Sequence, residues 1–278
     1  MASINKLNWA VIPCAGFGTR LLPVTRSVPK AMLPIGNYPI IHFAVKEAVS
    51  IGIENILIII GDGMDPIRNY FTDNLILNKK LEAEGKTELL DMQNEITNFA
   101  DIRFLLQEKP LGVGQAIKLT KRIIGDNPFS VILPDDLIFA KPNALDQLYT
   151  VYKKHKGHVV GLNNLKNNEI QEKGIVGFTE ESDRYKINQL VEKPKLSEAP
   201  SKTGILGRYI FESSIFDQIM EVSDSEVNVT DALMASIPKT NVSGKILEGY
   251  HFDTGNLNGL VKASSFFLKN SKLILDKY

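Results

Sequence analysis

Short apolar runs alternate with longer segments of helical period in the first half of the chain, and this alternation constrains the fold most strongly. The runs Trp9–Pro13 and Asn55–Ile60 are almost purely apolar, as is typical of strands covered on both faces. Such strands, separated by helices, form βαβ units around a parallel sheet. The sequence therefore predicts an α/β fold with a central mixed, mostly parallel sheet flanked by helices.

The same patterns place the remaining elements. Strands are predicted at 9–13, 55–60, 102–107, 130–133 and 159–162, and helices at 40–50, 66–78, 114–124 and 142–155. After about residue 165, predicted strands at 174–179, 185–191 and 206–211 indicate a mixed-sheet extension. The charged stretch 81–99 lacks an apolar stripe and indicates an exposed hairpin of helices. Apolar residues at helical spacing over 258–269 predict a docking helix, either on its own core or on a partner subunit.

Composition excludes several classes of protein. The 278 residues carry 32 basic and 32 acidic side chains, so the formal net charge is zero. That balance lacks the basic excess typical of nucleic-acid binding. The single cysteine, Cys14, permits no internal disulfide, which favours a reducing compartment and hence the cytosol. The longest apolar run, Ile56–Ile60, is too short to cross a bilayer, so we expect no membrane association and no secretion.

A glycine-rich loop, Pro13-Cys14-Ala15-Gly16-Phe17-Gly18-Thr19-Arg20, directly follows the first predicted strand. Glycines in this position let the backbone N–H groups approach phosphate oxygens. A dinucleotide fingerprint needs a third glycine where Leu21 stands, which weakens a dehydrogenase interpretation. A Walker loop ending at Gly85-Lys86-Thr87 would need glycine at Lys80, so that match is rejected.

Three cations, Arg20, Arg26 and Lys30, follow within eleven residues, together with Pro23, Pro29 and Pro34. Prolines restrict the backbone and would hold these cations in place before a ligand arrives. The loop and the cations together predict a polyphosphate site.

These motifs make the chain resemble sugar-1-phosphate nucleotidylyltransferases. The resemblance rests on Ala15-Gly16-x-Gly18-Thr19-Arg20-x-x-Pro23 and Pro29-Lys30-x-Met32-Leu33-Pro34, and continues through Gln107-x-x-x-Leu111-Gly112-x-Gly114-x-Ala116, Leu133-Pro134-Asp135-Asp136, Val191-Glu192-Lys193-Pro194, Gly207-Arg208-Tyr209 and Val229-Thr230-Asp231-Ala232. The Pro13-x-Ala15-Gly16 opening is similar to that of bacterial UTP:glucose-1-phosphate uridylyltransferases. The resemblance implies a Rossmann-like nucleotidyltransferase fold in one domain, 1–278, with a nucleotide-binding half (1–165), a sugar-phosphate-binding half (166–257) and a C-terminal helix (258–278).

The reaction implied by the resemblance is Mg²⁺-dependent transfer of a uridylyl group from UTP to glucose 1-phosphate, giving UDP-glucose and pyrophosphate. Matching positions place Arg20 and Lys30 on the triphosphate and wrap the nucleotide with the loop residues Ala15, Gly16, Gly18 and Thr19. Gln107 and Gly112 match positions that read the base edge, where an amide pairs with an imide N–H and a carbonyl together.

Asp135 follows an apolar strand and so lies at the carboxyl edge of the sheet, the usual ligand side of an open α/β fold. It is our best candidate for a magnesium ligand, with Asp253 as a second by resemblance, since Mg²⁺ accepts few protein carboxylates. Asp136 is either part of that site or an exposed loop acid.

The sugar side of the site follows from the resemblance alone. It places Glu192 on sugar hydroxyls and Lys193 on the sugar phosphate. Gly177, Gly207 and Arg208 are expected to complete the sugar pocket.

Two departures from the family pattern leave alternatives open. Ala31 stands where glutamate is usual, and Gly174-Ile175 replaces the usual Tyr-Gly. A non-catalytic regulatory paralogue is therefore one alternative, although the retained Arg20, Lys30, Asp135 and Lys193 argue against it. Another alternative is a different sugar phosphate or nucleoside triphosphate. The resemblance and the Phe266-Phe267 pair in the C-terminal helix favour a homo-oligomer.

Overall fold

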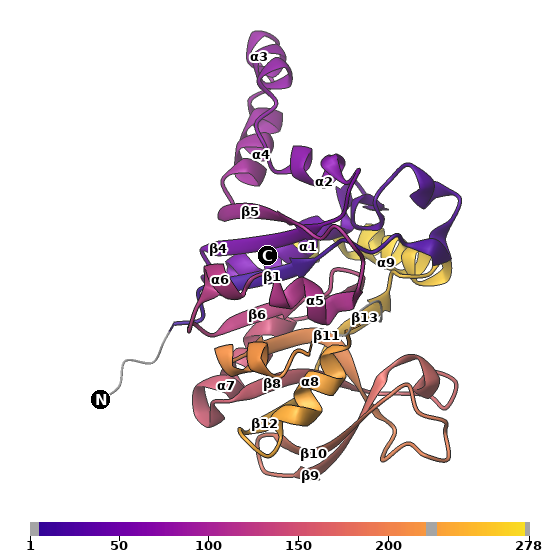
Figure 1. The fold of residues 1–278 in the computed structure, drawn as a ribbon. Helices are drawn as coiled ribbons and strands as arrows, with labels where there is room; N and C mark the ends of the chain where they lie inside the picture. Colours follow the sequence, from indigo (N-terminus) through magenta and orange to yellow (C-terminus); the bar gives the residue numbers. More distant parts are fainter. Residues whose placement is uncertain (1–5, 221–226, 276–278) are drawn as a thin grey trace.

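A continuous nine-stranded sheet forms the centre of the molecule (Figure 1). The computed structural model describes residues 6–220 and 227–275. Within these residues the strand order is β5-β4-β1-β6-β11-β8-β12-β10-β9. The strands are β1 (Trp9–Pro13), β4 (Asn55–Ile60), β5 (Asp101–Leu106), β6 (Phe129–Ile132), β8 (His158–Asn164), β9 (Gly174–Glu180), β10 (Tyr185–Glu192), β11 (Thr203–Phe211) and β12 (Val242–Ile246).

The first half of the sheet is parallel. β1 pairs in parallel with β4 and β6, and β4 pairs in parallel with β5. Val11 and Ile12 of β1 are fully buried, as are Leu57, Ile58 and Ile59 of β4. The α/β class and the central position of these two apolar strands are thus confirmed.

The second half continues the same sheet with mixed pairing. β11 is antiparallel to both β6 and β8, and β10 is antiparallel to β9 and β12, while β12 is parallel to β8. The sheet as a whole is therefore mixed, as predicted, and mostly parallel only in its first half. The antiparallel pairing of β9 with β10 has a local cause, because the two strands are joined by a short turn.

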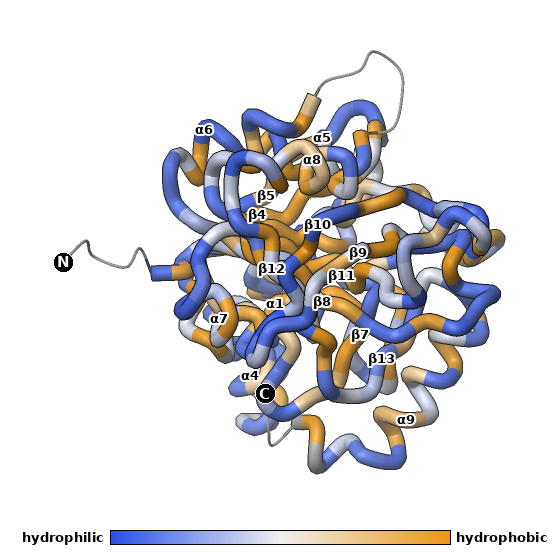
Figure 2. The backbone as a smooth tube through the Cα atoms, turned by 90° about the horizontal axis from the view of Figure 1, so that it is seen from below, coloured by the Kyte–Doolittle hydropathy of each residue, from blue (hydrophilic) through white to orange (hydrophobic). Residues whose placement is uncertain are grey.

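Helices cover both faces of the sheet, and successive strand residues contribute to different cores. The helices are α1 (Ile40–Ser50), α2 (Asp65–Tyr70), α3 (Leu75–Ala83), α4 (Thr87–Thr97), α5 (Gly112–Lys118), α6 (Lys121–Ile124), α7 (Ala144–His155), α8 (Val229–Ser236) and α9 (Leu257–Leu275). Val11 joins a core with residues of α5, α6 and α8, whereas Ala10 and Ile12 join a core with α1 and α7. Figure 2 shows the hydrophobic segments gathered in the middle and mostly hydrophilic loops outside.

Two predicted helices are each divided in the structure. The segment 66–78 forms α2 and α3, because Asn74 Oδ1 accepts a hydrogen bond from Leu77 N at 3.1 Å and starts a new helix there. The segment 114–124 forms α5 and α6. The hairpin predicted over 81–99 corresponds to α3 and α4, which project beyond β5 (Figure 1).

Small strand pairs lie outside the main sheet. β7 (Asp136–Phe139) pairs with β13 (Tyr250–Asp253), and β2 (Pro34–Ile35) pairs with β3 (Tyr38–Pro39). The sequence patterns did not predict these four strands, nor β12 and α8. The β7–β13 pair matters for function because it brings residue 253 opposite residue 136.

The C-terminal helix α9 docks on the chain's own core. Phe267 is 2% exposed and contacts Phe43, and both Phe266 and Phe267 lie against Phe139. The aromatic pair is thus used within the chain and does not itself argue for a partner. Parts of the three predicted ranges lie outside the described residues, namely 1–5 in the nucleotide-binding half, 221–226 in the sugar-phosphate-binding half and 276–278 in the C-terminal helix. None of the helices that the structure describes is both long and apolar enough to span a membrane.

Candidate active site

Two adjoining cavities open where β1 and β6 end at their carboxyl edges. The first, about 250 Å³, is lined by residues that include Pro13, Ala15, Gly16, Lys30, Gln107 and Gly112. The second, about 280 Å³, is lined by residues that include Arg20, Asp136, Glu192, Lys193, Gly207 and Asp253. Val113, Leu133 and Asp135 line both cavities. Asp135 therefore lies where the two cavities meet.

The glycine-rich loop is held against the segment that carries Lys30. Gly18 has a φ of +65°, which side-chain-bearing residues rarely adopt. A Cβ at Gly18 would stand 3.1 Å from Lys30 Cβ and 3.1 Å from Thr25 Cγ2. Thr25 Oγ1 donates to Gly18 O at 2.9 Å and fastens the turn. A glycine is thus needed here for both conformation and space.

Lys30 and Asp135 form an ion pair between the segment that follows the glycine-rich loop and the residues that follow β6. The Nζ–Oδ2 distance is 2.6 Å, and the side chains are 24% and 31% exposed. Nearby, burial raises the pKa of the Cys14 thiol above its usual range. Cys14 therefore stays protonated at neutral pH, as expected of a packed residue rather than a nucleophile.

Gln107 presents a fixed amide to the first cavity. It is 5% exposed, and its Nε2 donates to Gly112 O at 3.2 Å and to Gln115 Oε1 at 2.6 Å. Gly112, at the start of α5, has a φ of +88°. The two residues thus lie together at the edge of the first cavity, although they are five positions apart in the sequence.

Asp135 and Asp253 direct carboxylate oxygens into one small volume. A Cβ on Gly255 would stand 2.9 Å from Asp253 Oδ1 and 3.3 Å from Asp135 Oδ2. Thr254 N and Oγ1 both donate to Asp135 O, at 2.8 and 3.0 Å, which fixes the two segments together. The absence of a side chain at Gly255 leaves space beside these two carboxylates. This arrangement fits Mg²⁺, which completes its coordination with phosphate oxygens and water. No cluster of three or more His, Cys, Asp or Glu suited to a metal occurs in the part of the chain that the structure describes.

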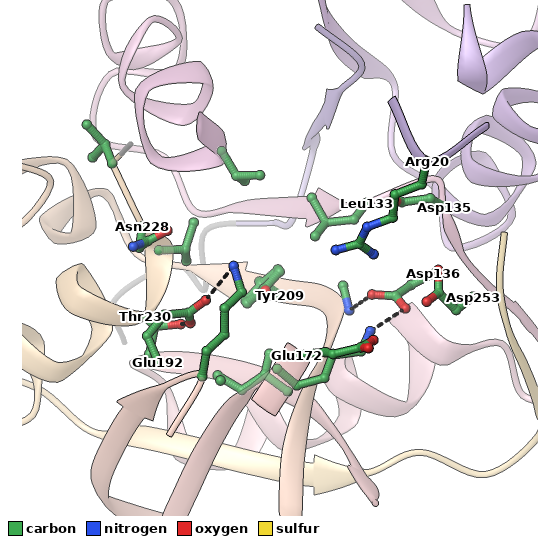
Figure 3. A pocket seen from close by; sticks show the side chains of 18 residues that line it. Arg20, Leu133, Asp135, Asp136, Glu172, Glu192, Tyr209, Asn228, Thr230 and Asp253 are labelled. Carbon is green, nitrogen blue, oxygen red and sulfur yellow. Dashed lines mark hydrogen bonds and ion pairs between the residues drawn. The ribbon is translucent and has the colours of Figure 1, made fainter. Parts of the chain in front are cut away.

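Asp136 is a buried, fully bonded carboxylate and not an exposed loop acid. Its Oδ1 accepts from Lys173 Nζ at 3.0 Å and contacts His251 Nε2 at 2.8 Å, and its Oδ2 accepts from Gly207 N at 2.9 Å. Burial alone would raise the pKa of Asp136, but Lys173 and His251 hold it well below its usual range. Figure 3 shows Asp136 beside Asp253, with Arg20 and Asp135 at the same end of the cavity and Glu192 and Thr230 at the other.

Glu192 and Lys193 lie at the end of β10, against Thr230 of α8. Thr230 Oγ1 donates to Glu192 Oε2 at 2.7 Å, and Lys193 Nζ lies 3.5 Å from Glu192 Oε1. Lys193 has a φ of +45°, a strained conformation for a residue with a side chain. A Cβ at Gly174 would stand 2.8 Å from Thr230 Oγ1, so glycine leaves the room for this contact.

Two of the predicted sugar-pocket residues lie elsewhere. Arg208 is 1% exposed and its guanidinium binds Glu47, with Nη2 2.9 Å from Oε2. The sequence context gave no sign of this pair because its members are 161 residues apart. Gly177 lies in the β9–β10 pairing, where a Cβ would meet Gln189 at 3.0 Å. Neither residue is among those that line the second cavity.

The other predicted residues line one or both cavities, except Gly18 and Thr19, which belong to the glycine-rich loop. Cavity-lining residues that the sequence interpretation missed include Lys173, Tyr209 and Thr230. Tyr209 and Thr230 stand inside motifs that carried the resemblance, so their motif context was the available signal. No pattern in the sequence singled out Lys173.

The comparison with protein families decides the assignment. Residues 9–270 match the nucleotidyl transferase family. The chain belongs to the nucleotidyl transferase family. This match covers both cavities and the strands and helices that form them.

This nucleotidyl transferase is similar to named uridylyltransferases. It is 39% identical over 265 residues to UTP–glucose-1-phosphate uridylyltransferase YngB of Bacillus subtilis, covering 94% of this chain and 89% of the relative. It is 36% identical over 278 residues to another UTP–glucose-1-phosphate uridylyltransferase of Bacillus subtilis, covering 99% of this chain and 95% of the relative.

Solved structures give the same picture of this nucleotidyl transferase. An apo UDP-glucose pyrophosphorylase superposes with a TM-score of 0.89 at 29% identity, covering 96% of this chain and 100% of that one. A UDP-glucose pyrophosphorylase complexed with UDP-glucose superposes with a TM-score of 0.86 at 30% identity, covering 95% and 100%. The predicted nucleotidyltransferase fold is confirmed.

Proposed function

We propose that this chain transfers a uridylyl group from UTP to glucose 1-phosphate, releasing pyrophosphate and forming UDP-glucose. The observation that carries the proposal is the meeting of two cavities at Asp135, one lined by the glycine-rich loop and the other by Glu192 and Lys193. Two substrates bound in adjoining cavities would meet at this carboxylate. The names of the relatives support UTP and glucose 1-phosphate as these substrates.

On the nucleotide side, the chain supplies positive charge and a base reader. Arg20 and Lys30 are placed to hold the triphosphate, and the backbone of Ala15, Gly16, Gly18 and Thr19 wraps around it. Gln107 Nε2 is occupied by Gly112 O and Gln115. Its Oε1 would accept the imide N–H of uracil, and Gly112 N would donate to a uracil carbonyl.

Asp135 and Asp253 would hold Mg²⁺ beside Gly255, given the oxygen positions described above. Mg²⁺ bound there would neutralise charge on the nucleotide phosphates. The ion pair with Lys30 holds the Asp135 carboxylate at the junction of the cavities. The carboxylates are therefore held in place before the substrates arrive, as preorganised electrostatic stabilisation requires.

On the sugar side, Glu192 would bind sugar hydroxyls and Lys193 the phosphate of glucose 1-phosphate. A phosphate oxygen of glucose 1-phosphate attacks the α-phosphorus of UTP. A new P–O bond forms, the bond from the α-phosphorus to the oxygen that bridges to the β-phosphate breaks, and pyrophosphate leaves. The protein contributes mainly by positioning two anions that repel each other and by neutralising charge.

A substrate panel tests the proposal. Purified protein is incubated with Mg²⁺, each of UTP, dTTP, CTP and ATP, and the 1-phosphates of glucose, galactose and N-acetylglucosamine, and pyrophosphate release is followed. We expect the highest rate with UTP and glucose 1-phosphate, and no release after chelation. Faster turnover of another pair would identify that pair as the substrates. No turnover with any pair would favour a regulatory paralogue.

We further propose that the chain works as one domain and as a homo-oligomer in a reducing compartment such as the cytosol. The exposed apolar side chains Leu257, Val261 and Leu268 of α9 support self-association. Light scattering coupled to size-exclusion chromatography tests this, and a monomer at micromolar concentration would contradict it.

A further inference from the structure

Lys173 links the two halves of the second cavity. It precedes β9, and its Nζ lies 3.0 Å from Oδ1 of Asp136, the first residue of β7. The side chains are 22% and 10% exposed, and both residues line the cavity. The dashed lines at Asp136 in Figure 3 include this ion pair. A charged contact therefore joins the segment that leads into β9 to the strand that follows Asp135.

The backbone of Lys173 holds the segment that is proposed to bind the sugar phosphate. Lys173 O accepts a hydrogen bond from Lys193 N at 3.1 Å. The next residue, Gly174, pairs with Glu192 in the β9–β10 ladder. Because Lys193 has a positive φ, its side-chain direction depends on such backbone contacts. The backbone of Lys173 and Gly174 is therefore joined directly to that of Glu192 and Lys193.

Asp136 is equally well tied to the carboxylate side. Besides Lys173, it contacts His251 Nε2 at 2.8 Å and accepts from Gly207 N at 2.9 Å. It also lies opposite Asp253 in the β7–β13 pairing. Asp136 is thus fixed relative to the two candidate magnesium ligands, Asp135 beside it in the chain and Asp253 across the strand pair.

Lys173 and Asp136 form a partly buried ion pair. Burial alone would lower the pKa of Lys173, but Asp136 raises it above its usual value. The desolvation of two partly buried charges is compensated only when the geometry is kept. We therefore expect the distance between Lys173 Nζ and Asp136 Oδ1 to vary less than that of a solvent-exposed ion pair.

We propose that Lys173 is a positioning residue for the sugar phosphate, because its ion pair with Asp136 sets the distance between Glu192-Lys193 and the carboxylates of Asp135 and Asp253. This inference rests on the proposed function. It assigns to Lys173 an effect on the sugar substrate that is much larger than any effect on UTP, since Lys173 and Asp136 line the cavity of Glu192 and Lys193 and not that of the glycine-rich loop.

The test compares Lys173→Met, Lys173→Arg and the control Lys166→Met. Methionine keeps an unbranched, flexible side chain without the charge, arginine still reaches a carboxylate, and Lys166 is an exposed lysine of the same segment outside both cavities. For Lys173→Met we expect the KM for glucose 1-phosphate to rise about tenfold while the KM for UTP stays within about twofold. Lys173→Arg should recover most of the loss, and Lys166→Met should match the unmodified protein.

Calorimetric binding without turnover gives a second readout. UDP-glucose should bind Lys173→Met about tenfold more weakly than the unmodified protein, whereas UTP should bind both equally. An unmodified protein that binds neither ligand would refute the proposed function. Unmodified protein that binds both, with UDP-glucose binding unchanged in Lys173→Met, would refute the positioning role alone.

A general structural effect has its own signature. If Lys173→Met weakened UTP and UDP-glucose binding by the same factor, the positioning role would be overturned. If that variant did not fold, Asp136→Asn would serve instead, because an amide keeps an acceptor for Gly207 N while removing the charge that pairs with Lys173. The same selective rise in KM for glucose 1-phosphate is then expected, and its absence would overturn the inference.

Discussion

Lys30 Nζ lies 2.6 Å from Asp135 Oδ2, although the two residues are 105 positions apart in the sequence. The contact joins the segment after the glycine-rich loop to the carboxylate at the junction of the two cavities. A cation and an anion are thus held together where a nucleotide phosphate and a sugar phosphate would meet.

Asp135→Asn should nearly abolish turnover without unfolding the chain. The amide has almost the same shape but no charge for Mg²⁺ or Lys30, and loss of such a group typically costs about a hundredfold or more in rate. The partial exposure of the side chain, 31%, predicts a small change in melting temperature. Pyrophosphate release and thermal denaturation measure both quantities.

The matched control is Asp126→Asn, an exposed aspartate in the turn before β6. It should keep the unmodified rate. Near-normal turnover of Asp135→Asn would remove Asp135 from the mechanism.

Lys193→Ala should lower kcat/KM for glucose 1-phosphate by about a hundredfold, since it removes a cation proposed to bind the sugar phosphate. Lys195→Ala, two residues further along and exposed, serves as the control. Steady-state kinetics with each substrate varied in turn measures the effect. Equal losses in the two variants would show that only the general charge of this segment matters.

Gly255→Ala should raise the Mg²⁺ concentration required for half-maximal activity. The added Cβ would stand 2.9 Å from Asp253 Oδ1 and 3.3 Å from Asp135 Oδ2, so it would occupy the space between the two carboxylates. We expect a shift of about tenfold, typical of a disturbed metal environment. A Mg²⁺ titration measures it, and an unchanged midpoint would argue that the metal is bound elsewhere.

Arg208→Met should destabilise the fold by about 3–5 kcal/mol, because it leaves the carboxylate of Glu47 buried without its partner. Both side chains are 1% exposed. The double variant Glu47→Leu with Arg208→Met should recover much of this loss. Urea denaturation measures the free energy of unfolding, and a stable single variant would contradict the importance of the pair.

Acid should destabilise the protein in part through His158. Burial lowers the pKa of His158 to about 4 from an ordinary value near 6.5. The unfolded chain therefore binds a proton at a higher pH than the folded chain, so this contribution is complete above about pH 6.5 and is lost as the pH falls to about 4. Its size is about 3 kcal/mol.

His158→Asn tests this pH dependence. The amide oxygen of asparagine can take the place of Nδ1 as the acceptor for Glu212 N, which lies 3.2 Å from Nδ1, but it does not titrate. Urea denaturation at several pH values should show a shallower slope for the variant between pH 6.5 and 4. Parallel slopes would show that His158 is not buried in its neutral form.

The strongest sequence signals were the apolar runs of β1 and β4, because a strand covered on both faces leaves little choice of residues. β13 was missed because it pairs only with β7, outside the main sheet, and its residues are partly exposed. The break between α2 and α3 depends on a single capping side chain, Asn74, which a helical apolar pattern does not reveal.

The site was predictable where motifs carried it and not where long-range contacts form it. Gln107, Asp135 and Glu192 stand in motifs that follow strands, so their places at strand ends could be inferred. The direction of the Arg208 side chain could not be inferred, because its partner Glu47 lies on α1. The pair forms only when β11 packs against that helix. The same holds for Lys173 and Asp136, whose contact requires the β7–β13 pair to lie against the residue that precedes β9.

The most direct test of the central claim follows the label of UTP through one reaction. With Mg²⁺ and glucose 1-phosphate, UTP labelled at the α-phosphate should place its label in UDP-glucose, and UTP labelled at the γ-phosphate should place it in pyrophosphate. Label from the α-phosphate appearing only in free UMP or UDP, or remaining in UTP, would contradict uridylyl transfer at this site.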